Sequence, residues 1–276
     1  MNSADIAVLA GNGKSGRRVA AALRVAGHRT RVAGRKGPVR FDWHEPATWP
    51  ELLDGADAVY VVAPGDDAGP VPSFVDAAVA AGVARLVMLS GRGFDHWDGR
   101  FGDTMVATEQ AVRASGRGTV LRSSNFAQNF TEELWEPAVR TGRLALPGQR
   151  IADSLIDLGD VAAVAARVLT EPGHEDRVYE LTGPESLTLE SALAILAAAT
   201  DRDLRYEPLT PEAYADELRT LGLGEADVAE LVGLWAIMAE GHLDGVSDDV
   251  PRLLGRPARA FGDWAVEQAA VGAWGV

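Results

Sequence analysis

A glycine-rich turn between a short apolar run and an amphipathic segment limits the possible folds of this chain more than any other feature. Residues 6–10 are typical of a buried strand, and residues 11–16, Gly-Asn-Gly-Lys-Ser-Gly, form the turn. A helical pattern with apolar residues on one face follows, and a second strand is predicted over 30–33. Strand, glycine turn, helix and strand in this order predict a βαβ unit of the kind that holds a dinucleotide.

Each glycine of the turn has its own physical reason. Gly11 allows the tight turn, Gly13 lets the backbone approach a pyrophosphate, and Gly16 lets the helix pack closely on the strand. The N-terminus of the helix also supplies unpaired N–H groups and the positive end of its dipole. A glycine turn without a ligand is the alternative. The residues predicted to hold a cofactor here are Gly11, Asn12, Gly13, Lys14, Ser15 and Gly16.

Strands and helices continue to alternate after this unit. Strands are predicted over 58–62, 85–89 and 119–122, with helices between them, which predicts an α/β fold with a doubly wound parallel sheet, the Rossmann arrangement. Helical patterns dominate the later part, including one long amphipathic stretch over 211–240. We expect two interleaved domains. They are a nucleotide-binding Rossmann domain over 1–153 and a smaller, mostly helical substrate domain over 154–276.

Composition and charge exclude several classes of function. The 26 basic and 40 acidic residues give a net charge of −14, which argues against direct nucleic-acid binding and against an anionic membrane surface. The chain has no cysteine, and its five histidines show no metal-ligand spacing, so we expect no metal. The first residues enter a strand without a basic or apolar leader, which predicts a cytoplasmic location. The expected partner is a small-molecule substrate. A homodimer stays open as the oligomeric state.

The end of the second strand carries basic residues where many dinucleotide sites carry an acid. An acid there binds the ribose hydroxyls of the unphosphorylated cofactor and repels a 2′-phosphate. Here Gly34 is followed by Arg35 and Lys36, and a guanidinium pairs well with a phosphate. We therefore expect NADP(H) to be preferred over NAD(H), with a solvated basic loop as the alternative.

Several sequence blocks resemble the NmrA-like branch of the atypical short-chain dehydrogenase/reductases, which includes azoreductase-like and quinone-reductase-like NAD(P)H-binding proteins. The resemblance covers nearly the whole chain. It is specific for the fold and the cofactor, but it does not identify the reaction, because members of this family differ in the reaction. The blocks include the glycine turn, Phe41-Asp42-Trp43, Val61-Val62-Ala63-Pro64, Leu89-Ser90-Gly91, Ser123-Ser124-Asn125 and Leu181-Thr182-Gly183-Pro184.

The resemblance implies a position for each part of the cofactor. Residues 42–43 would flank the adenine, residues 63–65 would line the ribose and pyrophosphate, and residues 90 and 123–125 would lie at the nicotinamide. Ordinary loop serines at 90 and 124 and a turn residue at 42 are the alternatives. The cofactor-binding residues implied in this way are Asp42, Trp43, Ala63, Pro64, Gly65, Ser90, Ser123, Ser124 and Asn125.

The usual proton donor of short-chain reductases is absent from the sequence. That donor is a tyrosine with a lysine four residues later, and none of the four tyrosines here has a lysine at that spacing. We therefore expect an oxidoreductase that moves hydride from NADPH to a small aromatic or conjugated acceptor, such as a quinone, an azo compound or an imine. Two alternatives stay open. One is a redox sensor without turnover, and the other is a non-redox isomerase, cyclase or dehydratase on the same fold.

Candidates for acid–base work and for substrate contact come from two groups of residues. The loop after the strand at 85–89 supplies Ser90, Asp95 and His96 as catalytic candidates, because His96 titrates near neutrality when unperturbed. A solvated lid is the alternative for this loop. An aromatic pocket for a planar substrate is predicted, with ordinary core as the alternative. Its candidate residues are Trp97, Trp135, Trp235 and Met238.

Overall fold

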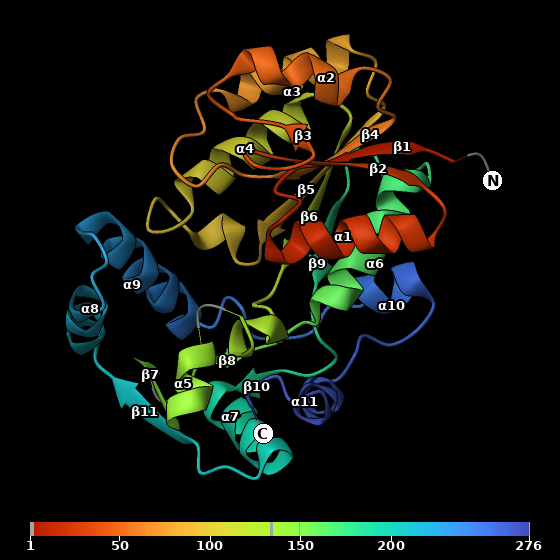
Figure 1. Cartoon of the computed structure of the whole chain (residues 1–276). Coiled ribbons are helices and arrows are strands. Elements are labelled where there is room, and N and C mark those ends of the chain that lie inside the picture. The colour runs from red at the N-terminus through yellow and green to blue at the C-terminus, as the bar shows by residue number, and fades with distance from the viewer. Residues whose placement is uncertain (1–2, 133–134, 149, 276) are drawn as a thin grey trace.

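The computed structural model describes residues 3–132, 135–148 and 150–275, and a seven-stranded sheet lies at its centre (Figure 1). The strand order is β3-β2-β1-β4-β5-β6-β9, and every neighbouring pair is parallel. The predicted doubly wound Rossmann sheet is therefore confirmed. The strands are β1 (Asp5–Val8), β2 (Arg29–Gly34), β3 (Val39–Arg40), β4 (Ala58–Val62), β5 (Arg85–Gly91), β6 (Gly118–Ser123) and β9 (Val178–Leu181).

Helices bury both faces of this sheet. Along β1, Ile6 and Val8 pack in the core with the helices α1 and α6, whereas Ala7 and Leu9 pack in the core with α2 and α3. A strand buried on both faces needs apolar residues at successive positions, which is why these strands appear as continuous apolar runs. The helices of one layer are α2 (Trp49–Leu53), α3 (Val71–Ala80) and α4 (Asp103–Ala114), and those of the other are α1 (Lys14–Val25), α6 (Leu158–Thr170) and α10 (Asp249–Leu254).

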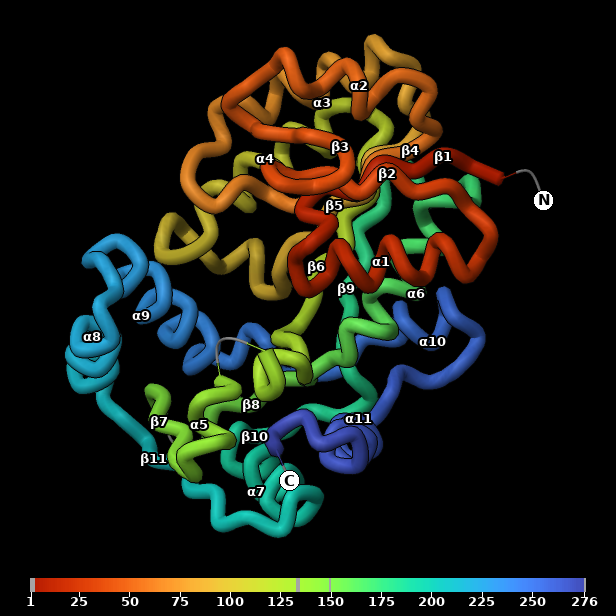
Figure 2. Tube along the Cα trace, in the orientation of Figure 1, coloured from red at the N-terminus to blue at the C-terminus, as the bar shows by residue number. Residues whose placement is uncertain are grey.

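A second body packs beyond the carboxyl ends of the strands. It contains a parallel pair of strands, β7 and β11, an antiparallel pair, β8 and β10, and the helices labelled α5, α7, α8, α9 and α11 in Figure 2. Within the described residues, three short 3-10 helices span Pro46–Thr48, Phe94–His96 and Ala127–Phe130. The elements of this body are α5 (Glu136–Thr141), β7 (Arg143–Pro147), β8 (Ala152–Asp153), β10 (Leu187–Thr188), α7 (Leu189–Thr200), β11 (Arg205–Leu209), α8 (Pro211–Thr220), α9 (Glu225–Ala239) and α11 (Phe261–Ala270).

The chain passes between the two bodies more than once. Helix α6 and strand β9 follow residue 153 and pack on the sheet, whereas α5 and β7 precede it and lie in the second body. The division at residues 153 and 154 stays a prediction. No helix in the described part of the chain is long and apolar enough to cross a bilayer.

The prediction of one continuous helical stretch over 211–240 is wrong in one respect, because two separate helices form there. Helix α8 ends at Thr220 and α9 begins at Glu225. Between them, Gly222 has a φ of +89°, a left-handed conformation that only glycine adopts without strain and that no helix continues through. The turn lets α9 fold back along α8, and both helices project as one arm (Figure 1).

Helix α9 lies directly against the loop over 92–102. The backbone N–H of Gly102 donates to Glu230 at 3.0 Å, and the Arg100 guanidinium pairs with Glu240 at 2.6 Å. The closest approach is at Gly233, where an added Cβ would lie 1.9 Å from the carbonyl oxygen of Arg100. A side chain at position 233 would therefore push the helix away from the loop.

The variant Gly233→Ala tests this close approach. We expect it to lower the free energy of unfolding by about 1–3 kcal/mol, because the methyl group overpacks the contact. Gly262→Ala in α11 is the matched control, since the nearest atom to its added Cβ lies 3.9 Å away, an ordinary contact. Urea unfolding measures both. Equal stability of the two variants would contradict the packing of α9 described here.

Candidate functional site

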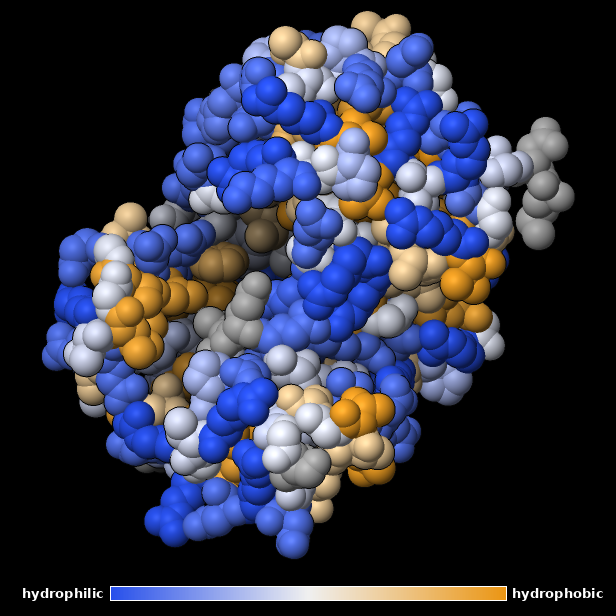
Figure 3. Space-filling model, in the orientation of Figure 1, coloured by the Kyte–Doolittle hydropathy of each residue, from blue (hydrophilic) through white to orange (hydrophobic). Residues whose placement is uncertain are grey.

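Two cavities lie along the carboxyl edge of the sheet and share one wall. The β2-side cavity lies at the ends of β2 and β4, and the β6-side cavity lies at the ends of β4, β5 and β6; each has a volume of about 500 Å³. Residues 62–65 line both, so the two cavities form one continuous trough. Ligands of open parallel sheets bind at this edge, where the strand order reverses. Figure 3 shows a hollow with apolar residues between the sheet body and the α8–α9 arm.

The glycine turn stands beside this trough. An added Cβ at Gly11 would lie 2.3 Å from the side chain of Val32, and one at Gly16 would lie 2.3 Å from the carbonyl oxygen of Ala10. These two glycines are therefore required by the packing of the protein itself. At Gly13 the nearest atom lies 3.1 Å from an added Cβ, so Gly13 is the glycine of the turn least restricted by the protein.

Helix α1 begins at Lys14 with Gly13 as its N-cap, and no side chain caps it. The first N–H groups of a helix have no partner within the helix, so they are available to an anion at this end. Of the turn residues, Lys14 lines the β6-side cavity and its ammonium donates to the side-chain oxygen of Asn129 at 3.0 Å. Asn12 is exposed and Ser15 is buried at the base of the turn. The open helix end and the glycine cradle fit a pyrophosphate.

The β2-side cavity contains three of the residues predicted for the adenosine end of a cofactor. Arg35, Asp42 and Trp43 line it, whereas Lys36 is not among its lining residues. The Trp43 ring packs edge-on against Phe41 and Phe74, with centroids 5.1 and 5.0 Å apart. This packing holds a flat indole in the cavity wall.

The β6-side cavity has a polar floor and an apolar cover. Ser90, Ser124 and Asn125 come from the ends of β5 and β6, and they line the cavity together with Lys14. The hydroxyl of Ser90 is buried and, within the described part of the chain, has no hydrogen-bond partner. A buried hydroxyl without a partner costs free energy, so this atom fits the donor or acceptor of a bound group. The apolar cover consists of Trp97, Phe101, Met105, Leu231, Leu234 and Leu243.

The neighbouring serine, Ser123, takes a different role. Its hydroxyl donates to the carbonyl oxygen of Ser124 at 2.9 Å, so it stiffens the end of β6. The Ser124 hydroxyl accepts from the guanidinium of Arg92 at 3.2 Å. Both serines line the cavity, and a role for either in cofactor binding stays a prediction.

One carboxyl group near the cavity was missed by sequence reasoning. Asp153 at the end of β8 is fully buried, and it accepts a hydrogen bond from the Asn125 amide at 2.6 Å. Burial raises the pKa of Asp153 to about 6, against the lowering effects of the Asn125 hydrogen bond and the Arg92 charge. Nothing in the local sequence around Asp153 distinguishes it, because its neighbours reach it only through the fold.

Two of the three catalytic candidates lie outside the cavity lining. His96 is exposed and its ring stacks on that of His242, with centroids 3.6 Å apart. The Asp95 carboxylate is mostly exposed and pairs with Arg122 at 3.0 Å. Ser90 alone of the three lines the cavity. The catalytic roles stay predictions. The described residues include no group of three or more histidine, aspartate or glutamate side chains that could hold a metal ion.

The four residues predicted as an aromatic substrate pocket belong to one hydrophobic cluster, but only one of them is among the cavity-lining residues. Trp97 lies in the cavity wall, where added Cβ atoms at Gly91 and Gly102 would both lie 2.8 Å from its ring. Trp135, Trp235 and Met238 are not among the lining residues and are buried in the core of the second body. Their large apolar surfaces fill that core together with Phe130 and Trp264. This position corresponds to the ordinary core that was the alternative to a substrate pocket for these residues.

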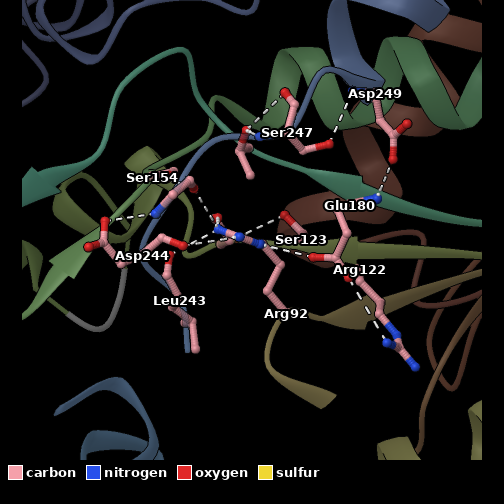
Figure 4. A network of polar contacts seen from close by, with 12 residues as sticks. Arg92, Arg122, Ser123, Ser154, Glu180, Leu243, Asp244, Ser247 and Asp249 are labelled. Atoms are coloured by element: carbon pink, nitrogen blue, oxygen red, sulfur yellow. Dashed lines mark hydrogen bonds and ion pairs between the residues drawn. The ribbon is translucent and has the colours of Figure 1, made fainter. Parts of the chain in front are cut away.

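The cover is attached to the sheet by a polar network centred on Arg92 (Figure 4). The Arg92 guanidinium donates to the carboxylate of Glu180 in β9 at 2.9 Å, and to the carbonyl oxygen of Leu243 at 2.9 Å and that of Gly245 at 3.2 Å. The Ser154 hydroxyl donates to the same Gly245 oxygen. One side chain at the end of β5 therefore connects β9, the end of β6 and the segment after α9.

A second arginine pairs beneath this network. Arg122 in β6 donates to Glu109 of α4 at 2.8 Å, and its side chain is 8% exposed whereas that of Glu109 is 1% exposed. Asp95, with a side chain 72% exposed, contacts the same guanidinium from the solvent side. The ring of Phe94 lies 4.3 Å from it. The buried pair fixes α4 against the sheet at the base of the cavity.

Comparison with known proteins agrees with this geometry. A sequence model of the NAD(P)H-binding family matches residues 9–172. The NAD(P)H azoreductase of Xenophilus azovorans is 35% identical over 234 residues, which are 83% of this chain and 81% of that protein. A solved NADPH-dependent quinone oxidoreductase of Escherichia coli, complexed with NADPH, aligns with a TM-score of 0.77 at 23% identity over 95% of this chain and 99% of that one. The negative transcriptional regulator NmrA, in complex with NAD, aligns with a TM-score of 0.76 at 15% identity over 99% of this chain and 97% of that one.

The two partners of Arg122 provide a stability test. We expect Arg122→Ala to cost about 3–5 kcal/mol of unfolding free energy, because it leaves the buried Glu109 carboxylate with only the longer ion pair to Arg113, at 3.8 Å. We expect Asp95→Ala to cost less than about 1 kcal/mol, because an exposed ion pair contributes little. Chemical denaturation at neutral pH measures both. A large loss in Asp95→Ala would show that this carboxylate supports the fold from the solvent side.

Proposed function

Because this chain belongs to the NAD(P)H-binding family, in the NmrA-like branch of the atypical short-chain dehydrogenase/reductases, we propose that it is an oxidoreductase that reduces a small conjugated acceptor with NADPH. The observation that carries this proposal is the continuous trough from Arg35 to Ser90, which passes the open end of α1. An extended dinucleotide needs this combination, with a pyrophosphate site between two pockets. The relative named NAD(P)H azoreductase supports the same class of reaction.

In this proposal the two halves of the cofactor occupy the two cavities. Asp42 and Trp43 would hold the adenosine half, the glycine turn and residues 63–65 would hold the pyrophosphate, and Ser90 and Asn125 would hold the nicotinamide half. NADPH, when bound, supplies the hydride. The chain's own part is to orient the acceptor and to keep water away from the reacting atoms.

The position of Arg35 supports a preference for NADPH. Its guanidinium lies in the wall of the β2-side cavity, where a 2′-phosphate on the adenosine ribose would be within its reach. Asp42 lines the same cavity, and its carboxylate accepts from the backbone N–H of His44 at 3.0 Å. We infer that Arg35 determines the choice of cofactor, because one oxygen of Asp42 is already engaged within its own turn.

The cover of the β6-side cavity supports a planar, apolar acceptor. Leu231 and Leu234 of α9 line this cavity together with Phe101 and Met105. No tyrosine is among the described residues that line it, so the proton that completes a hydroquinone, hydrazo compound or amine is proposed to come from water. Quinones, azo compounds and imines can accept hydride when water supplies the proton. They are the acceptors that we proposed from the sequence.

A titration followed by a turnover assay tests the function. NADPH binding is measured by tryptophan fluorescence, and NADPH consumption is then followed at 340 nm with a quinone, an azo dye or an imine added. Binding with turnover is the expected result. Binding without turnover would favour the redox-sensor alternative, and product formation without net oxidation of NADPH would favour the non-redox alternative.

The glycine turn provides a variant that separates cofactor binding from folding. We expect Gly13→Ala to weaken NADPH binding at least about tenfold while changing the unfolding free energy by less than about 1 kcal/mol, because the added methyl group would crowd the turn on which the pyrophosphate is proposed to lie, 3.1 Å from the Ala10 carbonyl oxygen. Gly16→Ala is the comparison, with an expected loss of about 1–3 kcal/mol of stability from its clash with the Ala10 carbonyl. Fluorescence titration and urea unfolding give the two readouts. Unchanged affinity in Gly13→Ala would contradict the placement of the pyrophosphate.

The choice of cofactor is tested at Arg35. We expect Arg35→Ala to weaken NADPH binding by about tenfold or more and NADH binding by less than about twofold, because only NADPH carries the phosphate that pairs with the guanidinium. Arg40→Ala is the matched control, since Arg40 is exposed, pairs with Glu45 and is not among the cavity-lining residues. An unchanged NADPH-to-NADH affinity ratio in Arg35→Ala would refute the proposed preference.

A further inference from the structure

The buried carboxyl group of Asp153 stands directly behind the wall of the β6-side cavity. It is fully buried, whereas Asn125, the residue it contacts, is half-buried and lines the cavity. The Asn125 amide nitrogen lies 2.6 Å from Oδ2 of Asp153 and 3.7 Å from the sulfur of Met238. The other carboxyl oxygen, Oδ1, is buried and has no hydrogen-bond partner within the described residues. The contact with Asn125 is therefore the main side-chain hydrogen bond of this carboxyl group.

This contact determines the orientation of the Asn125 amide. An ionised carboxylate only accepts hydrogen bonds, so it must face the NH₂ group of the amide and not its oxygen. Met238 reinforces the choice, because its thioether is a weak acceptor. With the nitrogen engaged on the protein side, the amide oxygen is the polar atom that Asn125 can offer to the cavity. An isolated asparagine could turn its amide over and offer a donor instead.

We propose that Asp153 is a positioning residue that makes Asn125 a hydrogen-bond acceptor in the cavity wall, and that this wall recognises an N–H group of the bound ligand. The orientation of the amide follows from the protein alone, whereas the identity of the ligand rests on the proposed function. Two sources can supply the N–H group. One is the carboxamide of a nicotinamide dinucleotide, and the other is an amino substituent on the acceptor.

Acidification should reverse this arrangement. Because the pKa of Asp153 is raised to about 6 by burial, its carboxyl group takes up a proton as the pH falls through that value. The protonated group can donate to the Asn125 oxygen, which frees the amide to turn over and present NH₂ to the cavity. Arg92 is the charged group whose field acts on Asp153, and it favours the ionised form. The neighbours Asn125, Ser154 and Met238 are uncharged. Recognition of an N–H group should thus be strongest above pH 6 and weaken below it.

The chain offers a matched control for the test variant Asp153→Asn. Asp157 is also a buried carboxylate that accepts from a buried side-chain amide, that of Gln128, at 2.6 Å. Neither Asp157 nor Gln128 is among the lining residues of either cavity. Asp157→Asn therefore repeats the loss of a buried carboxylate beside an amide, without touching the cavity wall. Both substitutions preserve side-chain shape.

The experiment compares ligand pairs that differ in a single N–H group. For the cofactor, the probes are NADP⁺ and its 3-acetylpyridine analogue, in which a methyl group replaces the carboxamide nitrogen. For the acceptor, they are 2-amino-1,4-naphthoquinone and 1,4-naphthoquinone. At pH 7.5 we expect the wild-type and Asp157→Asn proteins to prefer one N–H-bearing probe by about three- to tenfold, the effect of one hydrogen bond. We expect Asp153→Asn to lose most of that preference, and the wild-type preference to decline below pH 6.

The ligand pair that responds identifies the source of the N–H group. A change in the dissociation-constant ratio of the two dinucleotides assigns it to the carboxamide, and a change confined to the KM ratio of the two quinones assigns it to the acceptor. If dinucleotides bind and both ratios are the same in Asp153→Asn and Asp157→Asn, the proposal is overturned. A structural role alone would alter both members of each pair equally.

A second readout needs no ligand and separates this proposal from the proposed function. The side-chain ¹⁵N–H₂ signal of Asn125, assigned by its absence in Asn125→Ala, should shift with a midpoint near pH 6 in the wild type and show no such transition in Asp153→Asn. If no dinucleotide binds but this titration is observed, the proposed function fails and the positioning role stands. If the signal does not titrate between pH 5 and 7, the positioning role fails, whatever the protein binds.

Discussion

The Arg92 guanidinium makes the interaction on which the rest of this structure depends. It projects from the end of β5 and contacts Glu180 of β9, Ser124 after β6 and the carbonyl oxygens of Leu243 and Gly245. Its side chain is 11% exposed, so these hydrogen bonds replace water and leave few of its donors unsatisfied. Together with Ser154, which donates to the same Gly245 oxygen, this residue holds the segment after α9 at the carboxyl edge of the sheet.

The attachment creates two chemically different halves of one trough. At the β2 end the wall belongs to the sheet body alone, and it carries the basic Arg35 and the flat ring of Trp43. At the β6 end the second body closes over the edge and brings leucines of α9 opposite the serines of β5 and β6. Apolar side chains exclude water there, which strengthens the remaining polar contacts. A buried carboxyl group, Asp153, lies behind this wall, and its Oδ2 accepts a hydrogen bond from the Asn125 amide.

Sequence reasoning succeeded where a residue's role depends on its neighbours in the chain. The glycine turn between β1 and α1 and the strands predicted over 85–89 and 119–122 are local features, and each lies where its pattern predicts. It was less informative wherever a side chain serves a distant partner. The tryptophans at 135 and 235 are candidates for a substrate pocket from the sequence, and in the structure they lie in a core assembled from many separate segments. His96 has the right chemistry for proton transfer, but its partner is His242, far away in the sequence.

The sequence by itself determined the sheet, its parallel connections and the position of the dinucleotide turn, because periodicity and glycine spacing act over a few residues and require no knowledge of the rest of the chain. Only the tertiary structure decided which side chains face the cavity at its β6 end. That surface is built from residues near 14, 90, 125 and 230–243, which lie far apart in the chain and meet only when the second body packs on the sheet. A long-range contact of this kind leaves no period and no spacing in the sequence. Its residues are recognised as partners only once their distances are known.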